Sequence, residues 1–138
     1  MALDPKIGSD VADDMMDAFD TACAAGKIRI YESGSSPPAT CATDIAGTLL
    51  AELTLGTPAF GASAAGAITA EEITADSDAN AAGTADYFRI WDSAGTTCNF
   101  QGTAGEAGDT PDLVLDESAI TLHATVDVSS LVLTLALE

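Results

Sequence analysis

The sequence predicts a mainly-β fold: an antiparallel β-sandwich, immunoglobulin-like or jelly-roll-like, preceded by one N-terminal amphipathic helix. Apolar residues recur with helical spacing near the N-terminus and with a spacing of two in short runs after residue 26. Turn-forming residues separate these runs about every 8–12 residues. Strands and helices do not alternate, which disfavours a parallel sheet. We therefore expect a helical arm at 1–26 and a β-sandwich domain at 27–138.

The predicted helix covers residues 9–25. Ser9 is a suitable N-cap, because its hydroxyl can accept a hydrogen bond from a free backbone N–H of the first turn. Aspartates follow at positions 10, 13 and 14, where the helix dipole favours negative charge. Gly26 suits the left-handed conformation that often ends a helix. The arm is therefore expected to be one helix with an acidic, solvated side.

An apolar stripe runs along this helix. Val11, Met15 and Phe19 recur every four residues, and Cys23 continues the series. Two roles fit such a stripe: it is a contact surface for another chain or a symmetry mate, or it covers one end of the β-sandwich. We take Val11, Met15 and Phe19 as interface candidates and keep the covering role as the alternative.

Runs with a spacing of two indicate the strands. The clearest is 48–55, in which Leu49, Leu53 and Leu55 share one side and Glu52 lies on the other. A Gly-containing turn at 92–95 predicts a hairpin, and a Gly-rich loop is expected at 102–111. The expected strands are 27–31, 48–55, 67–75, 84–92, 96–101, 112–116, 120–123, 125–128 and 131–137.

The charge balance excludes several kinds of partner. Lys and Arg number 4 and Asp and Glu number 22, so the formal net charge is −18. Such a chain lacks the cations that grip a phosphate backbone or an anionic membrane, so we expect no nucleic acid and no membrane partner. Hydrophobic residues make up 47% of the sequence, which argues against disorder. Because acidic groups repel one another, we expect stability and assembly to rise with salt or divalent cations.

The cysteines are three: Cys23, Cys41 and Cys98. An odd number at irregular spacing matches neither a disulfide framework nor a zinc site. Reduced, partly buried thiols are the expected state, and a Cys41–Cys98 bridge is the alternative.

One acidic turn resembles part of a calcium-binding loop. Asp76, Asp78 and Asn80 match its first three oxygen positions. The match then fails, because the positions for glycine and glutamate hold Ala81 and Tyr87. We therefore expect no metal site and keep these three residues as weak candidates for calcium or magnesium.

No motif points to catalysis. His123 is the one histidine, and Ser63 lies in a segment that misses the G-x-S-x-G nucleophile motif at its last position, Ala65. Phosphate-cradling and dinucleotide-binding glycine motifs are absent from the sequence. We expect no enzyme activity, no catalytic residue and no cofactor.

The sequence pattern resembles a family of small virion proteins of tailed bacteriophages, some of which are head decoration or cement proteins. The resemblance extends from the helix through nearly the whole chain and is one of pattern, because none of its segments carries chemistry. Its marks are 27–31 (KIRIY) before the Ser/Gly/Pro loop, 47–55 (GTLLAELTL), 58–61 (PAFG), 83–90 (GTADYFRI), 92–96 (DSAGT) and the strands between Ile120 and Leu137.

This resemblance implies a non-enzymatic protein that binds the outside of the phage head. Its partners would be the major capsid protein and copies of itself, as a dimer or trimer, and it would bridge neighbouring capsomers against the outward pressure of packed DNA. It would be made in the bacterial cytoplasm, consistent with a start that lacks the pattern of a signal peptide. A tail or baseplate component is the first alternative. A carbohydrate- or cation-binding β-module, with Tyr31, Tyr87 and Trp91 as stacking residues, is the second.

Overall fold

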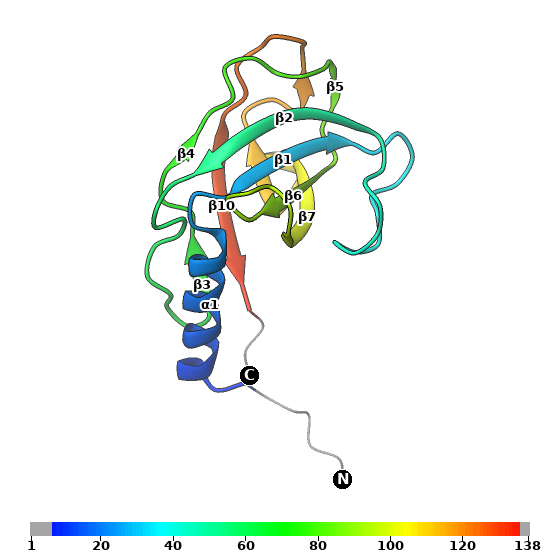
Figure 1. The fold of residues 1–138 in the computed structure, drawn as a ribbon. Helices are drawn as coiled ribbons and strands as arrows, with labels where there is room; N and C mark the ends of the chain where they lie inside the picture. The colour runs from blue at the N-terminus through cyan, green and yellow to red at the C-terminus, as the bar shows by residue number, and fades with distance from the viewer. Residues whose placement is uncertain (1–6, 136–138) are drawn as a thin grey trace.

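The computed structural model describes residues 7–135 and confirms a mainly-β fold with one N-terminal helix (Figure 1). The helix, α1, spans Ser9–Cys23. The strands of the described part are β1 Lys27–Glu32, β2 Thr48–Leu55, β3 Ala67–Thr69, β4 Ile73–Thr74, β5 Gly83–Thr84, β6 Tyr87–Trp91, β7 Cys98–Glu106, β8 Leu113–Leu115, β9 Ala119–Ile120 and β10 Val128–Thr134.

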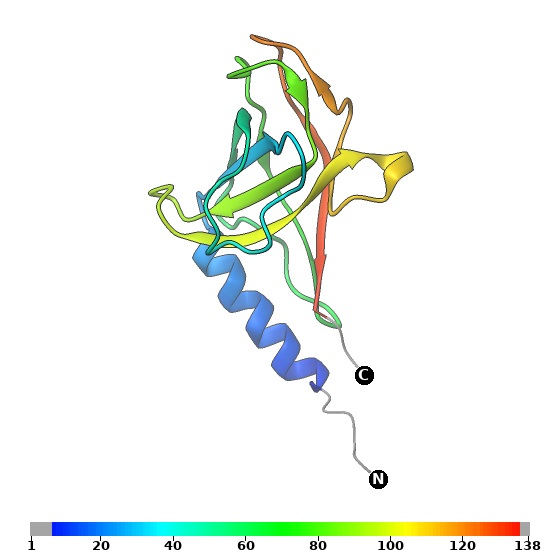
Figure 2. The ribbon, with the colours of Figure 1, turned by 90° about the vertical axis from the view of Figure 1, so that its right-hand side faces the viewer.

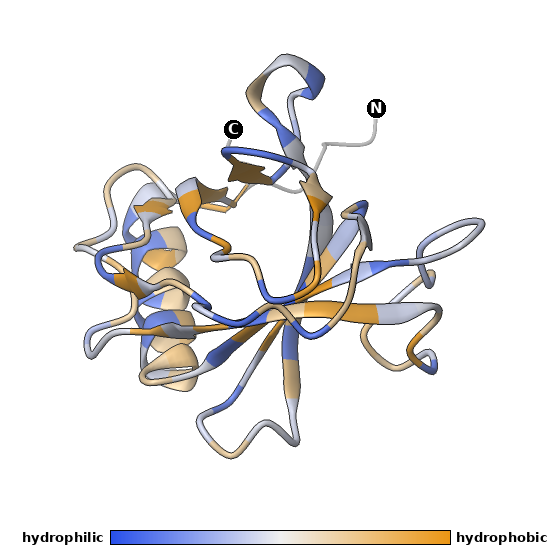
Figure 3. Ribbon diagram, turned by 90° about the horizontal axis from the view of Figure 1, so that it is seen from above, coloured by the Kyte–Doolittle hydropathy of each residue, from blue (hydrophilic) through white to orange (hydrophobic). Residues whose placement is uncertain are grey.

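Eight strands form one sheet in the order β3-β10-β8-β7-β6-β1-β2-β4, and β5 pairs with β9. The two end strands, β3 and β4, belong to one continuous segment, 67–74. Its first half pairs with β10, where the N–H of Ala70 also bonds to the carbonyl of Leu131 at 2.9 Å. Its second half pairs with β2. Because one segment supplies both ends, the sheet curls back on itself around the core, and seen from above its strands form a ring (Figure 3). We call this curled, sandwich-like sheet the barrel.

The sheet is mixed, because one pair departs from the expected antiparallel pattern. β7 and β8 run parallel, with Ala104 opposite Leu113. The connection includes a short 3-10 helix at Ala107–Asp109 and a left-handed residue, Thr110. Because the paired stretch is three residues long, the connection has to return only about 10 Å. A connection this short needs no crossover helix between the two parallel strands. The sequence pattern did not predict this parallel pair.

Several predicted boundaries were wrong in the second half of the chain. The stretch at 102–106, predicted as loop, belongs to β7. Gly102 is required there for packing, since a Cβ would lie 2.8 Å from the ring of Phe88. The run at 84–92 is interrupted and forms β5 and β6, and the stretch between β9 and β10 is irregular rather than two strands. The last predicted strand lies partly outside the described residues, as do residues 1–6 of the arm.

The ends of α1 also differ from the prediction. Gly8 is the N-cap residue, and Ser9 makes no side-chain cap. The helix ends at Cys23, and the left-handed residue after it is Ala25, with φ of 54°, rather than Gly26. Gly26 is instead needed for close approach, since a Cβ would collide with the carbonyl of Trp91.

The core lies inside the curled sheet. Strand registers place Ile28 of β1 between Leu53 of β2 and Ile90 of β6, all fully buried. The same alternation directs the neighbouring residues, Arg29 among them, to the outer face. Figure 3 shows the most hydrophobic stretches on the strands. The sheet therefore has an apolar inner face and an outer face that carries charged and aromatic residues.

Candidate functional site

The apolar stripe predicted on α1 divides between two environments. Phe19 packs against the core, with its ring centroid 5.7 Å from that of Phe60 and 6.1 Å from that of Phe100. Val11 and Met15 remain 56% and 48% exposed. The covering role therefore holds for Phe19, whereas Val11 and Met15 lie on the surface as an interface would require.

The rotation of α1 explains this division. Ala12 and Cys23 are fully buried, and Met16 packs against the core, so these residues define the inward side of the helix. At about 100° per residue, Met15 lies about 100° from Met16, on the flank of that side. The small side chain of the buried Ala12 allows the helix to lie close to the barrel.

Aspartates on the flank of α1 opposite Met15 set this rotation. Each accepts a hydrogen bond from the segment 60–66, which lies between β2 and β3. Asp13 accepts from the N–H of Gly66 at 2.8 Å, Asp17 from the hydroxyl of Ser63 at 3.0 Å, and Asp20 from the N–H of Phe60 at 2.7 Å. Charge-assisted hydrogen bonds are directional, so these three bonds fix the rotation of the helix. In this rotation Met15 lies on the other flank and stays exposed.

An apolar groove lies on that free side. It is bordered by α1, by the start of β7 and by the end of β10, which Figure 2 shows in blue, yellow and red. Its volume is about 370 Å³, and Met15, Phe19 and Phe100 line it together with Val132, which is 49% exposed. Asp112 is the charged residue of the lining. We call this feature the helix groove.

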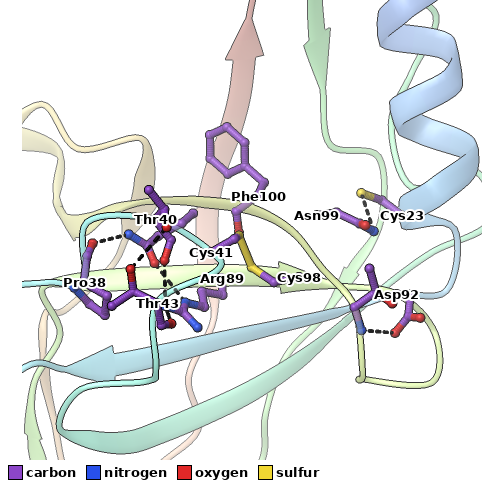
Figure 4. Close-up of a disulfide and its surroundings, with 12 residues drawn as sticks. Cys23, Pro38, Thr40, Cys41, Thr43, Arg89, Asp92, Cys98, Asn99 and Phe100 are labelled. Carbon is purple, nitrogen blue, oxygen red and sulfur yellow. Dashed lines mark hydrogen bonds between the residues drawn. A yellow bond between two sulfur atoms is a disulfide. The ribbon is translucent and has the colours of Figure 1, made fainter.

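The other candidate surface is the outer face of β1 and β6, which an irregular segment covers. This segment, residues 33–47, is called the strap. A disulfide joins Cys41 of the strap to Cys98 at the start of β7 (Figure 4). The expectation of reduced thiols was therefore wrong for this pair, while Cys23 is a free, buried thiol. The pair is separated by 57 residues, and only the tertiary fold brings them together.

Arg89 is buried beneath the strap, at 2% exposure. Its Nε donates to the Gln101 side chain at 2.8 Å, and one terminal nitrogen donates to the carbonyls of Thr40 at 3.1 Å and Thr43 at 2.7 Å (Figure 4). The Gln101 amide in turn donates to the carbonyl of Pro38. Burying a guanidinium is costly unless its donors are satisfied, so these bonds hold the strap and the arginine to each other.

The aromatic residues considered for sugar binding serve internal contacts. Tyr31 and Tyr87 are almost fully buried and stack at 4.9 Å between ring centroids. The hydroxyl of Tyr87 donates to the carbonyl of Ala46 in the strap at 2.7 Å. Burial raises the pKa of both tyrosines. Trp91 lies beneath the guanidinium of Arg29, 5.2 Å from it, so these rings do not form an open stacking platform.

The acidic turn at 76–80 is held by its own hydrogen bonds. Asp76 accepts from the backbone N–H of Glu52 and of Asp78, both at 2.9 Å. Asp78 pairs with His123, and the N–H of Asn80 donates to the carbonyl of Leu50. Within residues 7–135, no group of three or more His, Cys, Asp or Glu side chains converges as a metal site would require. The Asp76 carboxylate fastens this turn to β2.

The two residues considered for nucleophilic catalysis have different partners. The hydroxyl of Ser63 bonds to Asp17 and to the carbonyl of Asp13 on α1. His123, with φ of 64°, pairs with Asp78, and both side chains are 72% exposed. Ser63 and His123 therefore bond to different elements and not to each other, and their contacts hold the loops in which they lie.

Comparison with protein-family models, with curated proteins and with solved structures finds no match to this chain. The helix of the described part is too short and too polar to cross a membrane. We therefore infer function from the geometry and from the residue pattern. Of the surfaces above, the helix groove is the one that combines exposed apolar side chains with a concave shape, as binding surfaces do.

Proposed function

We propose that this chain is a non-enzymatic virion structural protein, a capsid decoration or cement protein that binds the outer surface of a phage head. In that role it bridges neighbouring copies of the major capsid protein and stabilises the DNA-filled shell. The observation that carries the proposal is the exposed apolar surface formed by Val11, Met15 and the helix groove on an otherwise strongly acidic barrel. A soluble acidic protein rarely exposes such a patch unless it contacts another macromolecule.

Two further features support this role. The pattern of strands and loops resembles that of small phage virion proteins. The barrel is also braced, since the strap is held by a disulfide and by buried hydrogen bonds. A cement protein needs only a modest interface per copy, because many copies act on one closed shell. A rigid module loses little conformational entropy when it binds, which favours this mode of action.

The test is the copy number of the protein in purified particles. Densitometry of virions from the phage that encodes the chain should find tens to hundreds of copies in the head fraction. A few copies in the tail fraction would support the tail or baseplate alternative instead. Absence from every particle, together with calorimetric binding of Ca²⁺ or a soluble glycan, would support the binding-module alternative and contradict the proposal.

A pair of variants connects the proposal to the helix groove. Met15→Ser removes an exposed apolar side chain from α1 and should weaken binding to undecorated heads while leaving the fold intact. Leu122→Ser is the matched control, because Leu122 is 50% exposed and does not line the groove. Equal binding of both variants to heads would contradict the assignment of this surface.

A further inference from the structure

Among residues 7–135, no strand pairs with one edge of the last part of β10, beside the helix groove, and we call this edge the free edge. Its first part pairs with β8, up to Leu131 opposite Leu113, and its last part pairs on the other side with β3. The chain before β8 does not continue along β10, because the N–H of Asp112 bonds to the hydroxyl of Thr103. The described residues therefore place no strand beside 132–134 on the side opposite β3.

The backbone register shows which groups this edge presents. Leu131 accepts from the N–H of Ala70, and the N–H of Leu135 donates to Gly66, so odd-numbered residues of β10 bond toward β3. Backbone groups of successive residues point to opposite sides in an antiparallel ladder. The N–H and C=O of Val132 and Thr134 therefore point to the free side. Both residues are exposed, so the edge can pair with an incoming strand.

The side chains next to this edge fit one face of such a strand. Leu133 is 6% exposed and lines the helix groove with Phe19 and Phe100. Alternate side chains of a strand added beside β10 would lie next to Leu133 and cover the exposed parts of Met15 and Met16. The groove would thus select apolar residues at every second position, while the backbone of β10 supplies the hydrogen bonds.

The charge distribution decides which partner fits. The formal net charge is −18, Asp112 lies in the groove, and no Lys or Arg is among the lining residues. The three cations among the described residues, Lys27, Arg29 and Arg89, lie on β1 and β6. A second copy would bring the same excess of negative charge to the interface. A segment flanked by Lys or Arg would instead be attracted by the negative charge of this chain.

We propose that β10 and the helix groove bind an extended segment of a partner protein, apolar at alternate positions and flanked by basic residues, as an added β-strand. This surface is defined without reference to a virion. If the proposed function is correct, the surface is where the shell protein would bind, but the test below needs no shell, so the two proposals can fail independently.

The probe is a synthetic peptide of alternating valine and threonine with two lysines at each end, added to the full-length protein. Fluorescence anisotropy in low salt should give a Kd at or below about 100 µM. Raising NaCl to 0.5 M should weaken binding severalfold, because the charge attraction is screened. A peptide with glutamates in place of the lysines should bind at least about tenfold more weakly.

Two variants test the role of the backbone edge. Thr134→Pro removes the N–H that points to the free side and should weaken peptide binding at least about tenfold. Thr134→Ala is the matched control, because it removes the side chain and keeps the N–H. A peptide N-methylated at the residues that face β10 makes the same test on the unaltered protein, and should fail to bind even where Thr134→Pro disturbs folding.

Three results would overturn the proposal. The first is equal binding of the lysine- and glutamate-flanked peptides, or no binding of either. The second is equal binding of the N-methylated and unmodified peptides. The third is a dimer of the protein, seen by sedimentation, that Thr134→Pro abolishes, since the edge would then belong to a second copy of this chain.

Discussion

The strap side and the groove side of the barrel differ in how their surfaces are covered. On the strap side, a buried arginine, two stacked tyrosines and a disulfide hold an irregular segment against the outer face of the sheet. On the groove side, apolar side chains of α1 and β10 remain exposed next to the edge of β10 with which no described strand pairs. We therefore expect the polar, cross-linked side to contribute stability and the open apolar side to be available for contact.

The disulfide should give the largest effect on the strap side. Replacing both Cys41 and Cys98 with serine removes a cross-link between residues separated by 57 positions. The free energy of unfolding should fall by about 2–4 kcal/mol, because the unfolded chain regains conformational freedom. Urea denaturation of the double variant, and of the wild type with and without reductant, measures this. If reductant leaves the midpoint unchanged, the strap does not depend on its cross-link.

Removing the buried guanidinium should give the next largest effect. Arg89→Met leaves the carbonyls of Thr40 and Thr43 without their donor and should cost about 3 kcal/mol in the free energy of unfolding. Arg29→Met is the matched control, because Arg29 is partly exposed and pairs with Glu52 at 2.6 Å. That control should cost about 1 kcal/mol or less. Equal losses in the two variants would contradict a special role for Arg89.

The two halves of the helix stripe should respond differently. Phe19→Ser removes a ring that packs on Phe60 and Phe100. Because this ring is only partly buried, the free energy of unfolding should fall by about 2 kcal/mol, less than for a fully buried ring. Met15→Ser, at an exposed position on the same helix, should change it by no more than about 0.5 kcal/mol. Thermal denaturation of both variants measures the difference. A large loss in Met15→Ser would show that the open side also carries stability.

Salt should stabilise α1 more than the strap. The helix carries Asp10, Asp13, Asp14, Asp17 and Asp20 and no basic residue, so like charges lie three and four positions apart. Raising NaCl or Mg²⁺ should therefore raise the melting temperature by about 3–5 °C. Amide hydrogen exchange should slow in the helix more than in the strap. A flat or falling melting curve would contradict this prediction.

The free thiol should give the smallest effect. Burial raises the pKa of Cys23 from 9.0 to about 11, against a weaker opposing hydrogen bond from Asn99. The fold thus favours the neutral thiol, and this contribution to stability is complete below pH 9 and is lost as the pH rises through 11. At pH 8, alkylation of Cys23 should be at least about 100-fold slower in the folded protein than in urea. Equal rates would show that the helix end opens readily.

Local patterns predicted part of the fold well. Strands β1 and β2 match the predicted ranges closely, because the alternation of apolar and polar residues is a local property of the chain. The turn at 92–95 was also predicted, and Asp92 holds it by accepting from the N–H groups of Thr96 and Thr97. These bonds lower the pKa of Asp92. Loops rich in glycine were harder, since Gly102 marks close packing in β7 rather than a turn.

The candidate site was predicted only in part. The stripe of Val11, Met15 and Phe19 was recognised from its spacing, but spacing alone does not show how a helix is rotated against its neighbour. That rotation is set by Asp13, Asp17 and Asp20, whose partners lie in the segment 60–66. The groove itself needs residues from α1, β7 and β10, and no local pattern relates these distant segments.

What the sequence determined by itself was the kind of element that many local stretches form, the strong acidity of the chain, and the apolar stripe of α1. These properties depend on residues close together in the sequence or on the overall composition, so the sequence alone is enough to predict them. Only the tertiary structure decided that the sheet closes through the segment 67–74, that Cys41 meets Cys98, and that, within residues 7–135, the end of β10 beside the helix has a strand on one side alone. The physical reason is that each of these contacts joins residues far apart in the sequence, and their meeting depends on the packing of the whole core.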